Sequence, residues 1–337
     1  MVLIGLIGAI PAYLIGFPMP FLMGALISVG VYSATRTAVF GVDATFPKPL
    51  RMMFVALIGV MIGASFSAEL MGDLPKIWAS LLVMGGYVIA SLAFGYGIFR
   101  HIGRLDQVTS FYSAMPGGLI EAVSLGEEAG GDVKVLALQH FTRVVLVVVT
   151  VPFLYWIWSG NAVGSAGGQS FDSAGWGPLD VAELFGLAFA GMWLGPKLRL
   201  PAAHMVGPMI LSAALHGSDL LHVATPEWLL ALAQLMVGTA LGTSFAGARP
   251  SHLARAFGLG ILYMTATLGL AFWIATTLAG VLPFGFDTLF VSFAPGGVTE
   301  MGLIALSLGI SPVIVTTHHI ARIGMTIVIA ALTVGRV

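Results

Sequence analysis

Long apolar stretches follow one another along nearly the whole chain, and prolines, glycines and a few charged residues separate them. A helix that crosses a bilayer needs about 20 predominantly apolar residues, and several stretches approach or exceed that length. In the first half, the pattern predicts helices over 2–15, 20–35, 50–67, 77–99, 107–126 and 134–158. In the second half, it predicts them over 181–195, 203–216, 227–245, 256–280, 287–308 and 312–334. The chain is therefore predicted to be an all-α polytopic membrane protein.

Composition agrees with this fold class and excludes several kinds of site. Hydrophobic residues make up 58% of the 337 residues and charged residues 9%, whereas a soluble domain carries about 25% charged residues. The net charge of −1 offers no basic surface for nucleic acid, and the absence of cysteine excludes disulfides, thiolate metal sites and cysteine nucleophiles. The first apolar stretch follows no basic residues, which favours a membrane segment over a signal peptide.

The two halves carry the same pattern. "PKPLRMMFVALIGVMIGASF" begins at Pro47, and "PEWLLALAQLMVGTALGTSF" begins at Pro226, at an offset of 179. The same offset relates Pro116, Gly117 and Gly118 to Pro295, Gly296 and Gly297, Glu121 to Glu300, His140 to His319, and Arg143 to Arg322. A looser match relates 16–27 to 199–210, at an offset of 183. We therefore predict a tandem duplication, with repeats at 1–158 and 179–337 joined by a Gly/Ser-rich loop at 159–178.

The parity of the crossings decides whether the repeats are parallel or inverted. The opening pair of helices in each half is short, and it forms either two crossings or one broken crossing. Inverted repeats place on one side Arg36, Lys48, Arg51, Arg100, Arg104, Arg249 and Arg255, and on the other Lys76, Lys134 and Arg336. Parallel repeats make these charges nearly cancel, so the positive-inside rule favours inversion. The opening pair is then expected to cross an odd net number of times, in repeats of five to six segments.

A Pro-Gly-Gly motif interrupts one predicted helix in each half, at Pro116–Gly118 and Pro295–Gly297. Such irregular backbone is tolerated at membrane depth only where it is buried in protein or lines a cavity. Glu121 and Glu300 fall in the first turn after each interruption, where a carboxylate complements the helix N-terminus. Capping alone does not explain an acid at membrane depth in both halves, so a functional role is the leading hypothesis.

A histidine and an arginine three residues apart share one face of the next predicted helix, as His140 with Arg143 and His319 with Arg322. A buried arginine needs a partner, and the nearest candidates in the pattern are Glu121 and Glu300. One reading is a static ion pair that holds helices together. The other is proton exchange by the histidines and glutamates, or binding of an anion by the arginines, with histidine titration near neutral pH if a glutamate approaches.

Small residues recur at Gly59, Gly63 and Ser65 and at Gly238, Gly242 and Ser244, a pattern typical of close helix packing. Acidic residues in the predicted loops, among them Asp132, are expected to be solvated. The remaining histidines have no metal-ligand spacing, so no metal site and no cofactor are predicted.

The doubled motif PGG-x-x-E followed by H-x-x-R resembles a known family. It is carried by "SAMPGGLIEAVSLGEEAGGDVKVLALQHFTR" and "SFAPGGVTEMGLIALSLGISPVIVTTHHIAR". The chain is similar over its whole length to the AbrB-duplication proteins of the bacterial inner membrane, labelled either transcriptional regulators or ammonia monooxygenases. The resemblance implies a multi-pass inner-membrane protein, with a distant likeness to cation antiporters and anion transporters that have inverted repeats and broken helices.

The leading functional hypothesis is a secondary transporter, not an enzyme, that moves a small organic anion with proton or sodium coupling. The residues expected to bind substrate are Pro116, Gly117, Gly118, Glu121, Arg143, Pro295, Gly296, Gly297, Glu300 and Arg322. Coupling is assigned to Glu121, Glu300, His140 and His319. The partners are then a small molecule and the bilayer, without nucleic acid, and a homo-oligomer is compatible with this reading. The alternative is a membrane sensor that affects gene expression indirectly, and a monooxygenase is disfavoured because it needs clustered metal ligands.

Overall fold

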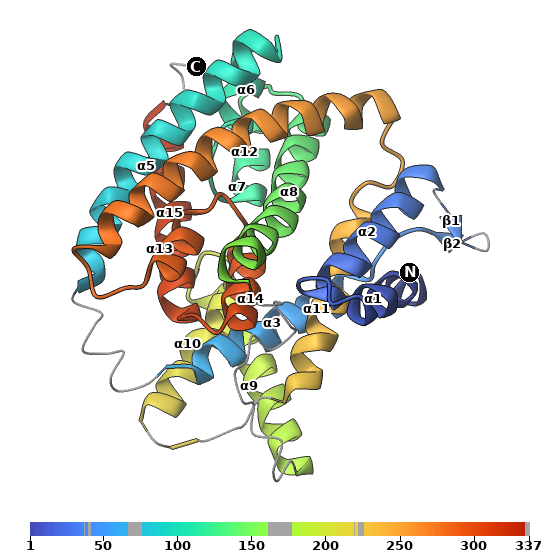
Figure 1. Ribbon diagram of the computed structural model, residues 1–337, viewed down its shortest axis with the longest axis vertical. Helices are drawn as coiled ribbons and strands as arrows, with labels where there is room; N and C mark the ends of the chain where they lie inside the picture. Colours follow the sequence, from blue (N-terminus) through green and yellow to red (C-terminus); the bar gives the residue numbers. More distant parts are fainter. Residues whose placement is uncertain are drawn as a thin grey trace. The chain divides into compact units, whose positions relative to one another are not determined.

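The computed structural model describes residues 1–36, 38–39, 42–66, 76–160, 177–218, 220–221 and 226–333. Most of the predicted connecting loop, at 161–176, lies outside the described residues. The first half contains α1 (Val2–Leu14), α2 (Pro20–Thr35), the short strands β1 (Ala38–Val39) and β2 (Val42–Asp43), α3 (Lys48–Ala64), α5 (Ile77–Gly97), the π-helical η2 (Ile98–Ile102), α6 (Gln107–Ser113), α7 (Leu119–Glu128) and α8 (Val133–Ser159). The second half contains α9 (Pro178–Lys197), α10 (Ala203–Gly217), α11 (Glu227–Thr243), α12 (Pro250–Ala279), α13 (Phe286–Phe293), α14 (Val298–Leu308) and α15 (Pro312–Thr333) (Figure 1).

The predicted all-α class is confirmed, and β1 and β2 add only a two-residue antiparallel pair. Five of the described helical stretches are long and apolar enough to span a membrane: Ile77–Ile102, Val133–Trp158, Leu179–Lys197, Pro250–Ala279 and Pro312–Thr333. Their outer faces carry exposed apolar side chains such as Trp78, Ile89 and Trp273, which lipid accommodates and water does not. The chain is therefore a membrane protein.

The helices form two compact units. Unit 1 comprises Met1–Asp73, Pro152–Gly247 and Thr299–Val313, and unit 2 comprises Leu74–Val151, Ala248–Val298 and Ile314–Val337. Each unit takes helices from both predicted repeats. The predicted repeats are therefore not separate folded units, because each compact unit contains helices from both of them.

In unit 1, the opening pair of helices in each half folds into an antiparallel hairpin. Ser28 Oγ donates to the Ile4 carbonyl at 2.9 Å, and a Cβ built on Gly8 would lie 2.2 Å from the Gly24 carbonyl oxygen. The pair α9–α10 repeats this, since a Cβ on Gly195 would lie 2.2 Å from the Ala203 carbonyl oxygen. Each opening pair therefore turns back on itself, and the alternative of one broken crossing is wrong.

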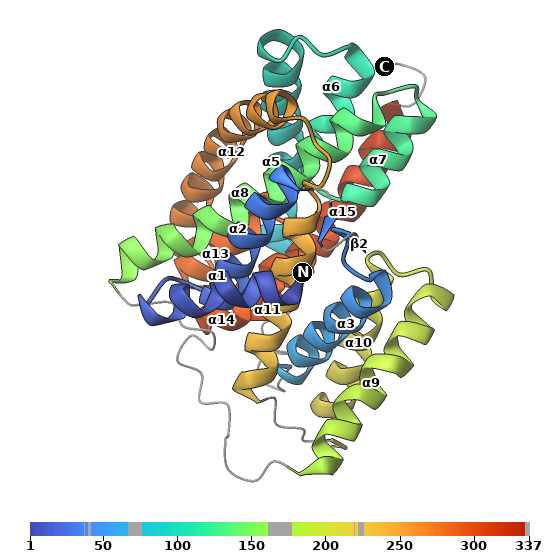
Figure 2. The ribbon, with the colours of Figure 1, turned by 90° about the vertical axis from the view of Figure 1, so that its right-hand side faces the viewer.

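Each hairpin packs against the third helix of the other half. Figures 1 and 2 show α3 beside α9 and α10, while α11 packs on α1 and α2. The contacts are backbone to backbone: a Cβ on Gly59 of α3 would lie 2.3 Å from the Met205 carbonyl oxygen, and a Cβ on Gly238 of α11 would lie 2.3 Å from that of Leu22. The predicted packing role of these glycines is confirmed. Gly59 and Gly238 are related by the offset of 179 and their partners by 183, so the exchange matches the predicted duplication.

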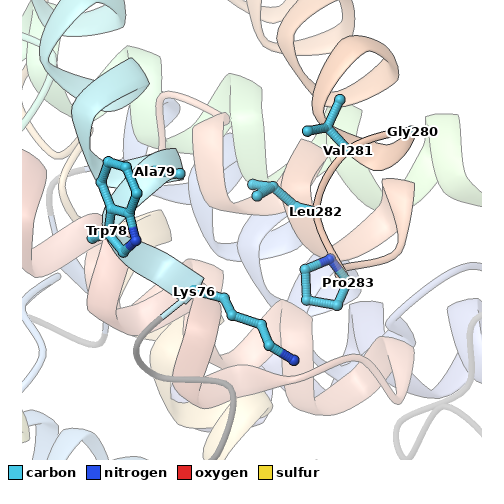
Figure 3. Close-up of a pocket in the computed structure, with 7 residues that line it drawn as sticks. All are labelled: Lys76, Trp78, Ala79, Gly280, Val281, Leu282 and Pro283. Atoms are coloured by element: carbon cyan, nitrogen blue, oxygen red, sulfur yellow. The ribbon is translucent and has the colours of Figure 1, made fainter.

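In unit 2, the counterpart helices α5 and α12 run in opposite directions (Figure 1). The start of α12 meets the end of α5 through a hydrogen bond from the Arg255 guanidinium to the Gly103 carbonyl. At the other end, Lys76 and Trp78, at the start of α5, line an open groove together with Gly280–Pro283, which follow α12 (Figure 3). Inverted repeats require this relation between counterparts, so it supports inversion, and the symmetry of the complete halves stays a prediction.

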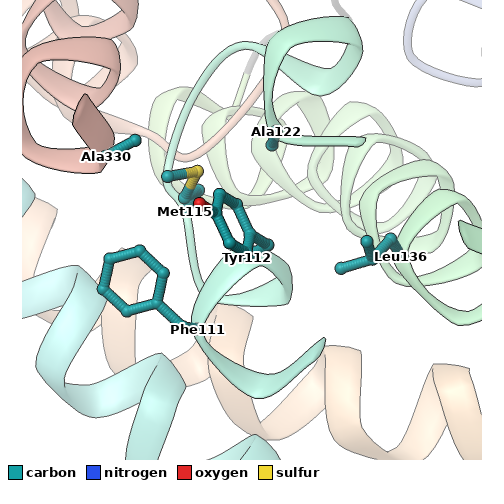
Figure 4. Packing of buried hydrophobic residues seen from close by; sticks show 6 residues of the cluster. All are labelled: Phe111, Tyr112, Met115, Ala122, Leu136 and Ala330. Carbon is teal, nitrogen blue, oxygen red and sulfur yellow. The ribbon is translucent and has the colours of Figure 1, made fainter. Parts of the chain in front are cut away.

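The segment over 107–126, predicted as a helix interrupted by Pro-Gly-Gly, consists of α6 and α7, which fold back on each other instead of continuing in one direction. A Cβ on Gly126 of α7 would lie 3.1 Å from Tyr112 of α6, and the Asp132 amide donates to Thr109 Oγ1 at 3.0 Å. Phe111, Tyr112 and Met115 pack with Ala122, Leu136 and Ala330 in an apolar cluster that holds the α6–α7 hairpin (Figure 4). Pro116–Gly118 form its tip, where Gly118 adopts φ +65°, a conformation that glycine reaches without strain.

The return of 107–126 bears on how many times each half crosses the membrane. With 107–126 as one crossing, inverted repeats require an odd net number of crossings from the opening pair. Both segments turn back on themselves. The number of crossings that the opening pair makes stays a prediction. Lys134 also moves to the end of unit 2 that holds Arg100 and Arg104, because the hairpin returns the chain there.

The unusual backbone positions recur with the same offsets. Met19 and Ala202 both have positive φ, 45° and 46°, and lie 183 residues apart. Gly130 and Gly309, with φ of 91° and 66°, lie 179 apart. Positive φ is uncommon for residues other than glycine, so a shared position at Met19 and Ala202 supports the predicted duplication. The correspondence ends at Gly118, whose counterpart Gly297 does not share its positive φ.

Candidate functional site

The first Pro-Gly-Gly motif faces α8, whose His140 and Arg143 hold the end of α6. Arg143 is 4% exposed, and its guanidinium donates from Nη1 to the Met115 carbonyl. His140, fully buried, donates from Nε2 to the Tyr112 carbonyl at 3.0 Å. Tyr112 lies in the last turn of α6, where carbonyls lack intrahelical partners, and Met115 follows two residues after the helix ends. The cation therefore lies at the negative end of the α6 dipole, where it is favoured.

The second motif repeats this arrangement on α15. Arg322 donates from Nη1 to the Ala294 carbonyl at 2.6 Å, and from Nη2 to the Gly296 carbonyl. His319 donates from Nε2 to the Val291 carbonyl at 3.1 Å. Both acceptors shared with the first half, Ala294 and Val291, lie 179 residues after Met115 and Tyr112. The H-x-x-R motif thus has one structural task in both halves, which is to bind the carbonyls that precede Pro-Gly-Gly.

The predicted pairing of Glu121 with Arg143 is wrong, because the described residues of unit 2 contain no ion pair between them. Glu121 is half-buried in the first turn of α7, and its carboxylate folds toward Gly118. Glu300, 6% exposed in the first turn of α14, belongs to unit 1, where Arg51 is the cation that acts on it. Each acid complements a helix start and each arginine a helix end, so the charges are matched to backbone dipoles.

His319 is a neutral imidazole in this arrangement. Its Nε2 must carry hydrogen to donate to Val291, and its Nδ1 accepts a hydrogen bond from Arg322 Nη2 at 2.7 Å. A second ring proton would point at the guanidinium. The expected approach of a glutamate, which would hold the histidine near a neutral titration, is not found for His140 or His319 among the described residues. No described glutamate therefore supports the predicted titration of His140 and His319 near neutral pH.

The two arginines lie near each other with two tyrosines that the sequence analysis missed. Arg143 and Arg322 interact electrostatically with one another and with Tyr87 and Tyr263. Tyr263 Oη donates to the Ala114 carbonyl at 3.0 Å, and the Tyr87 ring packs edge-on against Phe293. All four side chains are nearly or fully buried. A tyrosine within a long apolar helix was the available signal, but nothing in the pattern shows which face it occupies.

Several buried polar atoms around this centre have no partner in the described structure, among them Arg143 Nε and Arg322 Nε. Buried donors without an acceptor are rare and each calls for an explanation. Gly117 lies against one of them, because a Cβ there would be 3.4 Å from Arg322 Nε. No cluster of three or more metal-ligating side chains occurs within the described ranges. The centre, formed by Arg143, Arg322, Tyr87 and Tyr263, is a set of donors suited to oxygen acceptors.

Comparison with known proteins agrees with the doubled motif. "Putative regulator AbrB" of Escherichia coli (strain K12) is 24% identical over 291 residues, which cover 86% of this chain and 81% of that protein. "Uncharacterized protein YhjN" of Bacillus subtilis (strain 168) is 24% identical over 343 residues, 93% of this chain and 86% of the relative. Residues 21–337 match the family described as "Transition state regulatory protein AbrB". The chain belongs to this AbrB family of membrane proteins.

Proposed function

We propose that the protein is a secondary transporter of the bacterial inner membrane that moves a small organic anion, bound at Arg143 and Arg322. The observation that carries this proposal is the pair of buried guanidiniums, each with an unpartnered Nε and neither paired with a carboxylate in unit 2. Two buried like charges repel each other, and burial without a counter-charge costs several kcal/mol per ion. A carboxylate supplies both the missing charge and the missing acceptors.

The helix ends support the same role and set its limits. The carbonyls of α6 and α13 offset part of the positive charge, since a helix C-terminus carries up to about half an elementary charge. The Pro-Gly-Gly loops bring backbone close to the guanidiniums without side chains in between. Irregular backbone of this kind serves substrate sites in other membrane transporters. The activity involves no chemical conversion, and Glu121 and Glu300 remain candidates for ion coupling.

Binding is tested first by thermal unfolding of the purified protein with acetate, succinate and citrate, which differ in charge. A ligand that binds only the folded state raises the apparent stability. We expect at least one carboxylate to raise the melting temperature of the wild type and of Arg36→Gln, an exposed control. Arg143→Gln and Arg322→Gln should abolish the shift. Equal shifts in all four proteins would contradict the site.

Transport is tested by uptake of the radiolabelled anions into proteoliposomes. A stabilising anion should accumulate with wild-type protein and not with Arg143→Gln. The second candidate, a membrane sensor, is favoured by the relative whose name says regulator. It predicts the same thermal shift without uptake, so these two measurements separate the two functions.

A further inference from the structure

His318 is a third buried histidine in unit 2, and the arginine centre does not use it. Its ring is fully buried and tilts against that of Phe293, at 5.8 Å between centroids. Nδ1 lies 2.8 Å from the Ile314 carbonyl oxygen, one turn earlier on α15. Nε2 lies 2.8 Å from Ser80 Oγ on α5. Ser80 Oγ in turn lies 2.8 Å from the Ile77 carbonyl oxygen.

These three contacts cannot all be hydrogen bonds when the ring is neutral. The Ile314 carbonyl only accepts, so Nδ1 must carry a hydrogen, and Nε2 of the neutral ring then accepts from the Ser80 hydroxyl. The single hydroxyl hydrogen is then no longer available to the Ile77 carbonyl. When the ring is an imidazolium, Nε2–H donates to Ser80 Oγ and the hydroxyl donates to Ile77. Only the protonated ring satisfies all three contacts.

The other two buried histidines of unit 2 differ in this respect. An added proton on His319 Nδ1 would face the Arg322 guanidinium, which already donates to that atom. His140 Nδ1 is buried without any acceptor. Of the three rings, His318 is thus the one that presents acceptors to both nitrogens.

We propose that His318 carries the coupled proton of the transport cycle, with Ser80 as its relay to α5. This inference rests on the proposed transport function. The proton binds at Nε2 and leaves from the same atom. On binding, the Ser80 hydroxyl turns to the Ile77 carbonyl at the start of α5. On release, it turns back to Nε2 and leaves that carbonyl without this bond.

Among the described residues, no negative charge acts on the His318 ring, so hydrogen bonds hold its proton. On α15, the groups are His319, which interacts electrostatically with His318, and Arg322 one turn further. α5 presents the Ser80 hydroxyl and α13 the Phe293 ring, and no described carboxylate acts on the ring. Burial disfavours the charged ring, whereas donation to two acceptors favours it. A small shift between α5 and α15 breaks the Ser80 contact and releases the proton.

The first test measures anion uptake into proteoliposomes with and without an inward proton gradient. His318→Gln is the matched variant, because Gln139 occupies the corresponding position on α8, 179 residues earlier. We expect His318→Gln to lose the stimulation by the gradient while retaining downhill uptake. Ser80→Ala, which removes the acceptor of Nε2–H, should move the pH profile to lower pH. The exposed His252→Gln should behave as wild type. Stimulation unchanged in His318→Gln would overturn the proposal.

The second test reads the ring itself and does not depend on transport. Nitrogen NMR of ¹⁵N-histidine-labelled protein, with His318→Gln to assign the signal, should show Nε2 of His318 changing protonation with pH, and Ser80→Ala should move this change to lower pH. A ring that stays neutral throughout the range in which the protein is folded would overturn the proposal. If wild type moves no anion of the panel, the proposed function fails, while the His318 signal still decides whether the ring takes up a proton.

Discussion

At the scale of the residue, the arginines differ in how many acceptors each side chain holds. Arg322 donates to the carbonyls of Ala294 and Gly296 and to the ring of His319. Arg143 donates to the Met115 carbonyl and to the Tyr263 hydroxyl. A guanidinium presents five donors in a fixed planar fork, whereas a lysine ammonium is a compact charge that does not reproduce this fork. A positive charge alone therefore does not replace the hydrogen bonds that Arg322 makes.

The asymmetry predicts unequal costs for the same substitution. Arg322→Lys keeps the charge but loses at least two hydrogen bonds to buried acceptors, so it should lower the free energy of unfolding by about 2–4 kcal/mol. Arg143→Lys keeps its carbonyl within reach of one donor and should cost about half as much. Thermal and denaturant unfolding of the purified variants, with Arg36→Lys as the exposed control, measures both. Equal losses at the two positions would contradict the difference in hydrogen bonding between the two arginines.

At the scale of the element, much of the helix pattern follows from the sequence. The predicted 20–35 and 77–99 agree closely with α2 and α5, because apolar runs and flanking prolines mark those bounds directly. The partners of Arg143 and Arg322 do not follow from it. Carbonyls are present at every residue, so a sequence shows where a buried cation lies and not which helix end it meets. The return at Gly118 is hidden for the same kind of reason, since the same Pro-Gly-Gly motif at Gly297 lacks its positive φ.

The base of the α6–α7 hairpin predicts a pH dependence of stability. Asp106 caps α6 by accepting from the Thr109 amide at 2.8 Å. Partial burial raises the pKa of Asp106, but hydrogen bonds from Thr109 and nearby backbone amides outweigh this and leave the pKa below its usual value. The ionised cap thus contributes stability above the unfolded pKa of about 3.9, and this contribution is lost as pH falls through the lower folded value.

Asp106→Ala should cost about 1 kcal/mol at neutral pH, as the loss of a helix cap does. Asp106→Asn should keep the cap and show a smaller loss of stability on acidification than the wild type. Unfolding curves of the three proteins at neutral and acidic pH measure this. A wild type and an Asn variant with the same acid dependence would exclude Asp106 as its source.

The exchanged packing of unit 1 predicts the effect of a single methyl group. A Cβ on Gly59 would lie 2.3 Å from the Met205 carbonyl oxygen, and backbone atoms there cannot yield without moving α10 against α3. Gly59→Ala should therefore destabilise by about 1–3 kcal/mol or more. Gly86→Ala on α5 is the matched control, because nothing lies within 4 Å of its Cβ. The control should be neutral or slightly stabilising, since alanine favours helix over glycine. A tolerated Gly59→Ala would contradict the close crossing.

At the scale of the whole molecule, both compact units are built by exchange between the predicted repeats. Neither half alone contains a complete unit, because α3 packs on α10 and α5 packs on α12. The arginine centre likewise takes Arg143 from the first half and Arg322 from the second. The predicted duplication thus places two copies of one motif in a single body.

The same organisation predicts which charged residues share a side of the membrane. The side on which Lys134 lies tests whether 107–126 crosses the membrane or returns. If 107–126 crossed the membrane, Lys134 would lie opposite Arg100. In the structure the α6–α7 hairpin returns, since the Asp132 amide meets Thr109 Oγ1, and Arg255 binds the Gly103 carbonyl. The basic residues Arg100, Lys134 and Arg249 then lie at one end of unit 2, which the positive-inside rule places in the cytoplasm. Lys76 lies at the other end.

The chain has no cysteine, so single substitutions report the side directly. Arg100→Cys, Lys134→Cys, Arg249→Cys and Lys76→Cys all replace exposed residues, and each variant is treated in cells whose outer membrane is permeabilised with a maleimide that cannot cross the inner membrane. We expect only the cysteine at 76 to react before the inner membrane is opened, and the other three to react afterwards. Joint reaction of the cysteines at 76 and 134 would show that α6 and α7 complete a crossing. Joint reaction of those at 76 and 249 would contradict the antiparallel course of α5 and α12, and with it the inverted repeats.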